Sequence, residues 1–220
     1  MRQIFLDTET TGLDPNQGHR IIEIAAVEMN NRQLTKNHYH TYVNPERNID
    51  QAAQDVHGIT SDFLQDKPLF KDIALEFISF IKGSEIIIHN APFDVGFLNM
   101  ELRKINLDIV ENISASIFDT LKLAKEIRPG QRNNLDALCK AYDVDNTSRA
   151  FHGALLDAQL LGDVYIGMTR GQEVLSIDFV QNSKSPKLKN INQDNLIIID
   201  PNSDELKAHD DFFSNLKKKG

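Results

Sequence analysis

The sequence predicts an α/β domain, in which a mixed sheet is flanked by helices, followed by a flexible C-terminal tail. Three observations support this fold class. Three strand-like segments come first in the chain, segments of helical and strand character then alternate, and a polar stretch without apolar periodicity follows Gly171. Hydrophobic residues make up 40% of the 220 residues, which is enough for a sizeable core. We expect the ordered domain to cover residues 1–171.

The strands are predicted from short apolar runs that are rich in β-branched residues. The first run leads into Asp7, and Pro45 ends the third. A later run, EIIIHN, is continuously apolar, as is typical of a central strand that is buried on both faces. The expected strands are residues 3–7, 20–30, 38–43, 85–90 and 116–120.

The helices are predicted where apolar residues recur at helical spacing. Gly83 and Pro129-Gly130 supply C-terminal stops for two of them, and Asn134 is expected to cap a third. That third helix carries Cys139, which we expect to be a buried apolar residue rather than a reactive thiol. The expected helices are residues 70–81, about 94–104, 120–128, a helix from 135 onward, and 153–168.

Composition and charge restrict the class of protein. A single cysteine excludes an internal disulfide and a cysteine metal cage. No apolar run approaches the roughly 20 residues of a membrane span, and the first residues do not have the pattern of a signal peptide. We therefore expect a cytoplasmic protein without a membrane partner. The net charge is -8, so binding to a polyanion should be weak unless a metal ion or a partner protein assists.

Acidic residues stand at three places where a strand ends or a helix begins. Asp7 and Glu9 are two residues apart at the end of the first strand, so they project to one face and Thr8 to the other. Asp94 begins a helix directly after an apolar strand, a usual place for sites in open α/β sheets. Asp157 lies in apolar helical sequence, where an unpaired carboxylate is unfavourable.

Each of these patterns has an ordinary structural reading on its own. A strand end can be solvated, a carboxylate near a helix N-terminus is favoured by the helix dipole, and His152 can be a surface or capping histidine. Clustered together, however, the four carboxylates would repel strongly unless a divalent cation lay between them. Oxygen ligands favour Mg²⁺ or Mn²⁺ over zinc. Two such ions roughly 4 Å apart can clamp a phosphodiester, and a neutral His152 could accept the proton of the attacking water.

The segments DTETTG, HNAPFD and HGALLD, in this order and at these separations, resemble the three motifs of the DEDDh exonuclease family. The resemblance covers residues 1 to about 170. The segments VHGIT at 56–60 and RPGQRNNLDALC at 128–139 are similar to the proofreading members of the family. The resemblance implies a ribonuclease H-like fold. It also implies a 3′–5′ exonuclease that removes mispaired 3′-terminal nucleotides of DNA as 5′-monophosphates.

The resemblance implies a role for each matching residue. Two divalent metal ions, Mg²⁺ or Mn²⁺, would be held by the four carboxylates, and His152 would be the general base. The 3′-terminal nucleotide of DNA would be contacted by several residues around the metal ions. These are Asp7, Thr8, Glu9, His57, Phe93 and Asp157. A turn histidine at His57 and a core phenylalanine at Phe93 remain open as alternatives.

The tail is predicted to consist of two parts. Residues 172–195 begin with QEVLSI, which resembles the short peptide that bacterial sliding clamps bind, and continue as a flexible linker. Its expected clamp contacts, within residues 172–177, are Gln172, Leu175 and Ile177. Residues 196–220 resemble the segment that attaches such exonucleases to the alpha subunit of DNA polymerase III. Composition alone also allows a strand and helix that fold back onto the domain.

Tethering would raise the effective concentration of an acidic exonuclease at the DNA 3′ end. In some bacteria a small theta subunit also binds such domains, and the sequence leaves its presence here open.

A DEDDh ribonuclease that trims RNA 3′ ends is the alternative function, because its metal site would be identical. The tail favours proofreading, since a clamp peptide and a polymerase-docking segment have no obvious use in RNA trimming. A non-catalytic module is disfavoured because all five catalytic positions are occupied.

Overall fold

The computed structural model describes residues 2–147, 149, 151–170, 203, 205–207 and 209. The chain divides into two units, Met1–Glu173 and Val174–Gly220, and the first contains the sheet. The predicted clamp peptide at residues 172–177 and the linker after it lie outside the described residues. Most of the predicted docking segment at 196–220 does as well, although its five described residues are helical.

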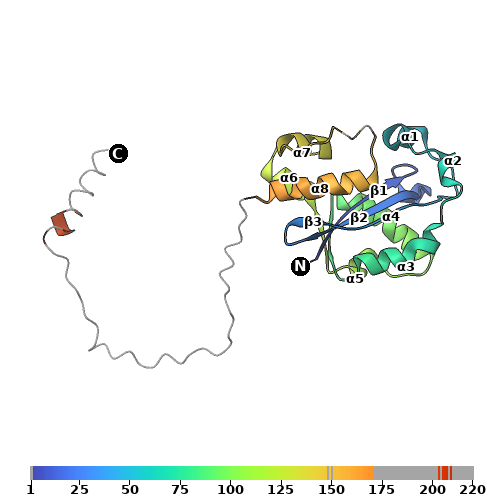
Figure 1. Cartoon of the computed structure of the whole chain (residues 1–220), viewed down its shortest axis with the longest axis horizontal. Helices are drawn as coiled ribbons and strands as arrows, with labels where there is room; N and C mark the ends of the chain where they lie inside the picture. Colours follow the sequence, from blue (N-terminus) through green and yellow to red (C-terminus); the bar gives the residue numbers. More distant parts are fainter. Residues whose placement is uncertain are drawn as a thin grey trace, which may run out of the picture. The chain divides into compact units, whose positions relative to one another are not determined.

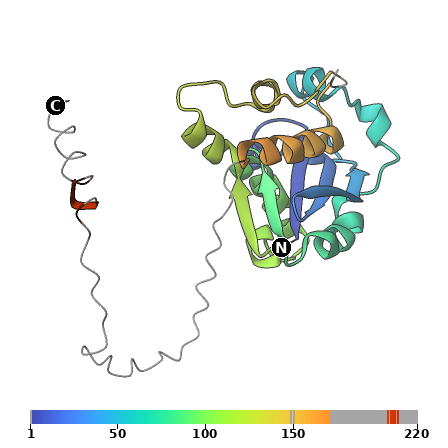
Figure 2. The same ribbon diagram turned by 60° about the vertical axis from the view of Figure 1, so that its left-hand side comes forward.

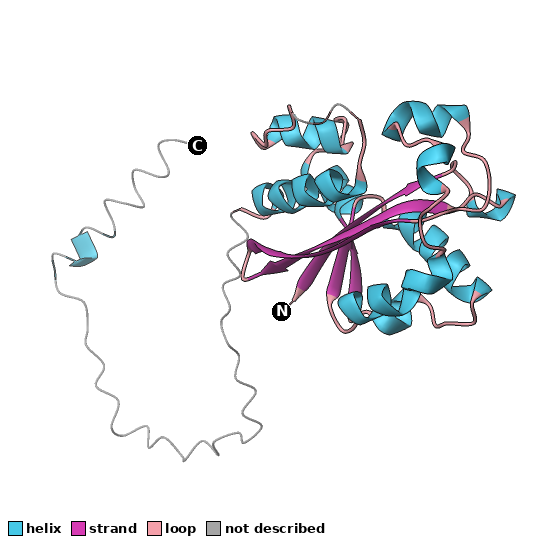
Figure 3. Cartoon of the chain, turned by 45° about the vertical axis from the view of Figure 1, so that its right-hand side comes forward, coloured by secondary structure: helices cyan, strands magenta, loops and turns pink. Residues whose placement is uncertain are grey.

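A five-stranded mixed sheet forms the centre of the first unit (Figure 3). The strand order is β3-β2-β1-β4-β5, with β2 antiparallel to both of its neighbours and β4 parallel to both of its own. The strands are β1 (Gln3–Thr10), β2 (Ile21–Asn30), β3 (Gln33–Tyr42), β4 (Glu85–Ile88) and β5 (Ser116–Asp119). The predicted α/β mixed sheet is therefore confirmed.

Helices cover both faces of this sheet (Figures 1 and 2). α8 lies across one face with α6 and α7 beside it, and α3 and α4 cover the other face. The helices on the second face pack on the larger of the hydrophobic cores. The helices are η1 (Pro15–Gln17), α1 (Gln51–His57), α2 (Ser61–Leu64), α3 (Phe70–Ile81), α4 (Ala91–Lys104), α5 (Val110–Ile113), α6 (Thr120–Ile127), α7 (Leu135–Ala141) and α8 (Ala154–Met168).

The alternation of side chains along β1 connects the two faces to the predicted site. Leu6 belongs to the core formed with α3 and α4, whereas Phe5 packs with Leu161 of α8. Residues two apart on a strand share a face, so Asp7 and Glu9 lie on the α8 side of the sheet. Thr8 lies on the α4 side.

The first and third strands are longer than the sequence predicted. β1 continues past Asp7 to Thr10 because its pairing with β2 extends that far, with a register shift after Glu9. β3 begins at Gln33 rather than at residue 38, since it pairs with β2 directly after a tight turn. Among its first residues, Gln33, Lys36 and Asn37 are polar and exposed and only Leu34 is apolar, so the segment carries little apolar signal of a strand.

Several predicted details are confirmed. The Asn134 side chain accepts a hydrogen bond from the Ala137 backbone nitrogen at 3.0 Å and so caps α7. Gly83 follows α3 in the left-handed region, with φ of 67°. Cys139 is a fully buried free thiol. None of the helices in the described part of the chain has both the length and the apolar character that crossing a membrane requires.

Candidate active site

The three predicted motifs meet at one end of the sheet. Asp7 and Glu9 come from β1, Asp94 is the fourth residue of α4, and Asp157 is the fourth residue of α8. Asp94 and Asp157 are 3% and 4% exposed, and Glu9 is 9% exposed. The carboxylates of Glu9, Asp94 and Asp157 all act electrostatically on Asp7. The folded chain therefore brings together the four carboxylates that the sequence singled out.

Three carboxylates of this cluster, those of Asp7, Glu9 and Asp94, hold protons unusually tightly. Burial, followed by repulsion from Asp94 and Glu9, raises the pKa of Asp7 well above its usual value. Burial and the neighbouring acids raise the pKa of Glu9 to about 8. Burial also raises the pKa of Asp94 to about 7, although hydrogen bonding to Thr8 opposes this effect. Without a counter-ion, the cluster is partly protonated at neutral pH.

Asp157 is the exception, because it has a cationic partner. Burial alone would raise the pKa of Asp157, but its contacts with His152 and Arg149 hold that pKa below its usual value. Arg149 donates from Nε to Oδ1 at 2.6 Å and from Nη2 to Oδ2 at 2.7 Å. Arg149 was not among the residues predicted from the sequence. An arginine in a polar stretch before a helix gives no signal that distinguishes it from a solvated one.

His152 lies beside Asp157 on the segment that leads into α8. Its side chain is 44% exposed, and its Nδ1 lies 3.4 Å from Asp157 Oδ2. The backbone nitrogen of His152 donates to the carbonyl oxygen of Val56 in α1 at 3.1 Å. This bond ties the histidine segment to the helix that ends in His57. His152 is thus accessible to solvent and in contact with the acidic cluster.

The side chains present fit a divalent cation. One ligand atom each from Glu9, His152 and Asp157 can be chosen so that all three lie within 4.8 Å of one another. Carboxylate oxygens of this kind suit hard divalent ions. From the sequence, His152 was predicted to be a base only. The structure places the imidazole close enough to the carboxylates to act on a ligand of a bound ion, or to be a ligand itself.

Hydrogen bonds from neighbouring groups hold the carboxylates of Asp94 and Asp119 in place. The Thr8 hydroxyl donates to Asp94 Oδ1 at 2.7 Å, across the sheet end from β1 to α4. Asp119 accepts from the backbone nitrogens of Asn90 and Leu121, at 3.2 and 2.9 Å. Asp119 therefore fixes the turn that leads from β4 into α4, in which Asn90 has a φ of 67°.

Glu23 is a further acidic residue of the site, and it was not among the residues predicted from the sequence. It lies on β2 opposite Glu9 and is 3% exposed. Its Oε1 is 2.7 Å from His40 Nε2, and its Oε2 accepts from the Ala154 backbone nitrogen at 3.2 Å. Glu23 thus holds the first turn of α8 against the sheet. An acid inside the apolar run IIEIAAV was the signal that could have revealed it.

A cleft of about 560 Å³ opens beside the cluster. Four predicted substrate contacts line it, namely Thr8, Glu9, His57 and Phe93. His57 is 5% exposed, and its Nδ1 accepts from the Ile59 backbone nitrogen at 3.0 Å. Its buried Nε2 has no hydrogen-bond partner among the described residues. The other two predicted contacts, the carboxylates Asp7 and Asp157, belong to the acidic cluster rather than to the cleft lining.

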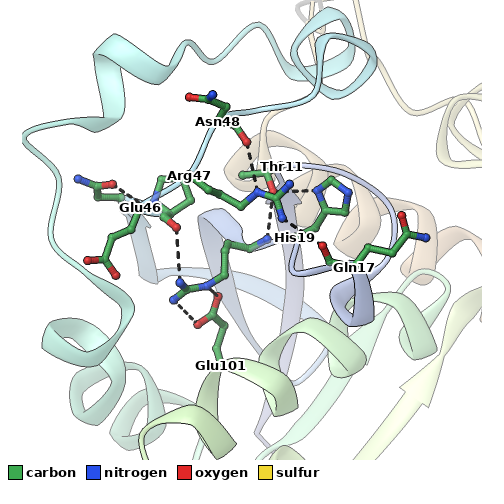
Figure 4. A network of polar contacts seen from close by, with 10 residues as sticks. Thr11, Gln17, His19, Glu46, Arg47, Asn48 and Glu101 are labelled. Carbon is green, nitrogen blue, oxygen red and sulfur yellow. Dashed lines mark hydrogen bonds and ion pairs between the residues drawn. The ribbon is translucent and has the colours of Figure 1, made fainter.

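A polar network supports one wall of the cleft (Figure 4). His19 Nδ1 lies 3.1 Å from the Thr11 hydroxyl, and Arg20 Nη2 donates to Glu101 Oε2 at 2.7 Å. A Cβ atom at Gly12 would lie only 2.3 Å from the His19 ring. The glycine of the first motif is therefore needed for this close approach to His19.

The raised pKa values predict that the metal-free protein loses stability as the pH rises. Glu9 and Asp94 bind protons more tightly in the folded state, so their contribution to stability is present below pH 4 and is lost as the pH passes 7 to 8. Above about pH 7 the buried His57 and the half-buried His89, whose pKa desolvation lowers, are neutral in both states and do not oppose this loss.

We expect the melting temperature in EDTA to fall by several degrees between pH 7 and pH 9. Excess Mg²⁺ should remove most of the decrease, because a cation stabilises the ionised carboxylates. Differential scanning calorimetry measures both effects. Glu9→Gln, which cannot ionise, should flatten the decrease in EDTA. A melting temperature that rises over this interval would contradict the electrostatic description of the cluster.

Comparison with known proteins shows the relationships of the chain. A sequence model of the RNase_T family, described as an exonuclease, matches residues 4–165. DNA polymerase III subunit epsilon from Pasteurella multocida is 47% identical over 231 residues, which is 99% of this chain and 90% of that protein. The protein of the same name from Buchnera aphidicola is 48% identical over 229 residues, covering 99% of this chain and 98% of that protein.

One solved structure is similar in sequence as well as in fold. Exonuclease X in complex with 5′ overhanging duplex DNA superposes with a TM-score of 0.61 and is 27% identical. That match covers 77% of this chain and 92% of the other. The sequence matches, in contrast, reach into the tail, since they cover 99% of this chain.

Proposed function

The chain belongs to the exonuclease family and, within it, to the epsilon subunits of DNA polymerase III, and from this we propose that it proofreads newly made DNA. It is a 3′–5′ DNA exonuclease that removes mispaired 3′-terminal nucleotides as 5′-monophosphates. The observation that carries the proposal is the convergence of Asp7, Glu9, Asp94 and Asp157 beside one cleft. The proposed role is cytoplasmic, where the bacterial chromosome is copied.

We propose that these four carboxylates hold two divalent ions, Mg²⁺ or Mn²⁺. When bound, such ions stabilise the charges that develop on the attacking and leaving oxygens of a phosphodiester. The raised pKa values of Glu9 and Asp94 support this role, because a divalent cation would relieve the repulsion that contributes to them. Thr8 would keep Asp94 in position through its hydroxyl.

His152 would act as the general base. Its place at the edge of the cluster, partly exposed and 3.4 Å from Asp157, lets a ring nitrogen take the proton of an attacking water. Asp157 would stabilise the imidazolium that results. The backbone bond to Val56 would hold the histidine near the cleft.

The 3′-terminal nucleotide would occupy the cleft. His57 lines the cleft and would contact a sugar or phosphate oxygen, and the Phe93 ring would pack against the terminal base. Because the Thr8 hydroxyl is engaged with Asp94, a contact from Thr8 to the nucleotide would come from its backbone. Glu9 would border both the nucleotide and a metal ion.

We further propose that the tail connects the exonuclease to the replication machinery. Residues 172–177 would bind the sliding clamp through Gln172, Leu175 and Ile177, residues up to 195 would serve as a linker, and residues 196–220 would bind the alpha subunit. The extension of the sequence matches through the tail supports this role. A theta subunit would be an additional partner of domain 1–171.

The test is hydrolysis of a labelled primer with a mismatched 3′ end, compared with the matching RNA strand, in Mg²⁺ and in EDTA. We expect metal-dependent release of deoxynucleoside monophosphates, with little cleavage of RNA. A preference for RNA would identify the chain as an RNA-trimming enzyme instead. Adding the polymerase alpha subunit and the clamp should accelerate removal of the mismatch. In the double variant Leu175→Ala, Ile177→Ala, the part of this acceleration that depends on the clamp should be lost. Unchanged stimulation by the clamp would exclude residues 172–177 as the clamp-binding peptide.

A further inference from the structure

Arg149 is surrounded by acidic and catalytic side chains although it lies outside the three motifs. Its side chain is only 6% exposed. Nε and Nη2 donate to the two oxygens of Asp157, at 2.6 and 2.7 Å, and Nη1 donates to Asp136 Oδ1 at 2.6 Å. A fork of this kind is among the strongest ion pairs in proteins, because both oxygens of the carboxylate are bound at once.

The same guanidinium also contacts the proposed general base. Arg149 Nη2 lies 2.7 Å from His152 Nδ1. A guanidinium can only donate hydrogen bonds, so Nδ1 of His152 must be the acceptor. In a neutral imidazole the proton then sits on Nε2. While this contact persists, neither ring nitrogen of His152 is free to accept a proton from water.

Arg149 therefore forms hydrogen bonds with the atoms that would bind the metal ion and accept the proton. Both oxygens of Asp157 that would bind a cation accept a hydrogen bond from the guanidinium, and the Nδ1 lone pair of His152 is engaged by it as well. We infer that Arg149 is a positioning residue that keeps Asp157 and His152 in a closed, inactive arrangement, and that a divalent cation must displace its guanidinium to free them. This inference rests on the proposed role of Asp157 as a metal ligand.

Charge repulsion and the small space available would prevent a divalent ion and the Arg149 guanidinium from occupying the site together. Ligand atoms of Glu9, His152 and Asp157 lie within 4.8 Å of one another, so a divalent ion among them would lie against the guanidinium. Two cations that close repel strongly at the low effective dielectric of a buried site. Asp136, whose side chain is 53% exposed on α7, remains as a partner for the displaced arginine.

The inference is tested by Mn²⁺ binding to the full chain without DNA. Isothermal titration calorimetry at pH 7.5 compares the unmodified protein with Arg149→Gln and Arg149→Lys. We expect Arg149→Gln to bind Mn²⁺ about tenfold more tightly, because no resident cation has to leave. Lysine keeps the charge but cannot bind both oxygens of a carboxylate at once. The Mn²⁺ affinity of Arg149→Lys should therefore lie between those of the other two proteins. A purely structural role for Arg149 would not tighten metal binding.

Thermal unfolding provides the second measurement. Arg149→Gln leaves the buried Asp157 without its partner, so in EDTA it should melt at a lower temperature, and Mn²⁺ should raise its melting temperature more than that of the unmodified chain. Arg103→Gln is the matched control for loss of one arginine charge. Arg103 lies nine residues after Asp94 on α4, about 13 Å along the helix axis, and its replacement should alter neither quantity.

The outcomes separate the inference from the proposed function. Equal Mn²⁺ affinity and equal Mn²⁺-induced shifts for the unmodified chain and Arg149→Gln would overturn the inference and leave the metal site intact. Absence of Mn²⁺ binding in every variant would overturn the metal site and the inference with it. If Arg149→Gln does not fold, Arg149→Lys provides the test. An Mn²⁺ affinity of Arg149→Lys equal to that of the unmodified chain would also overturn the inferred competition between the ion and the guanidinium.

Discussion

Replacing Asp7 by asparagine is expected to lower the rate of nucleotide release by at least about 10³-fold. Asp7 is the carboxylate on which Asp94, Glu9 and Asp157 all act, so it lies at the electrostatic centre of the cluster. Its removal takes away one of the carboxylates that would hold the proposed ions. The same substitution removes like-charge repulsion, so in EDTA the variant should be at least as stable as the unmodified chain.

Two measurements check this prediction: hydrolysis of a mismatched primer at saturating Mg²⁺, and melting in EDTA. Asp163→Asn is the matched control, since Asp163 lies on α8 but faces solvent, and it should retain the full rate. Near-normal hydrolysis by Asp7→Asn would refute the proposed metal site. A loss of activity accompanied by unfolding would instead show that Asp7 supports the fold.

Replacing His152 by glutamine is expected to reduce the catalytic rate constant by about 10²- to 10⁴-fold, the usual contribution of a general base. Glutamine keeps a polar side chain of similar reach but cannot accept a proton at neutral pH. The His152 side chain is 44% exposed, so the substitution should leave the melting temperature nearly unchanged. KM for the DNA should also change little.

Calorimetric titration with Mn²⁺ separates the two roles that the geometry allows for His152. If His152 is only the base, the variant binds Mn²⁺ with nearly the affinity of the unmodified chain. If affinity and rate fall together, His152 is a metal ligand, as its distances to Glu9 and Asp157 permit. His38→Gln, an exposed histidine on β3, is the control. An unchanged rate in His152→Gln would exclude both roles.

The parts of the site that follow strand and helix periodicity could be predicted from the sequence. Asp7 and Glu9 share a face because side chains alternate along a strand, and Phe5 fixes which face that is. Asp94 and Asp157 each lie in the first turns of a helix, as expected. These positions depend on local geometry, and the apolar pattern of the chain specifies that geometry.

The partners that complete the site could not be predicted in this way. Glu23 reaches the start of α8 from β2, and Arg149 reaches Asp157 from an irregular segment. Both contacts depend on how distant elements pack, and charged residues in a strand or loop usually face solvent. The helices α1, α2 and α5 were also missed. The four residues of α2 and of α5 are too few to show a helical period, and α1, although as long as the predicted α7, has only one large apolar residue, Val56.

The hydrogen bond between the His152 backbone nitrogen and the Val56 carbonyl has a consequence for fidelity. Val56 precedes His57, which lines the cleft, so the residue that would sense the primer end and the residue that would activate water are joined by one backbone contact. In the proposed mechanism, discrimination and chemistry would thus be mechanically linked. A DNA end that seats poorly against α1 would also meet a poorly placed base, so a substrate would be rejected by failing to react as well as by failing to bind.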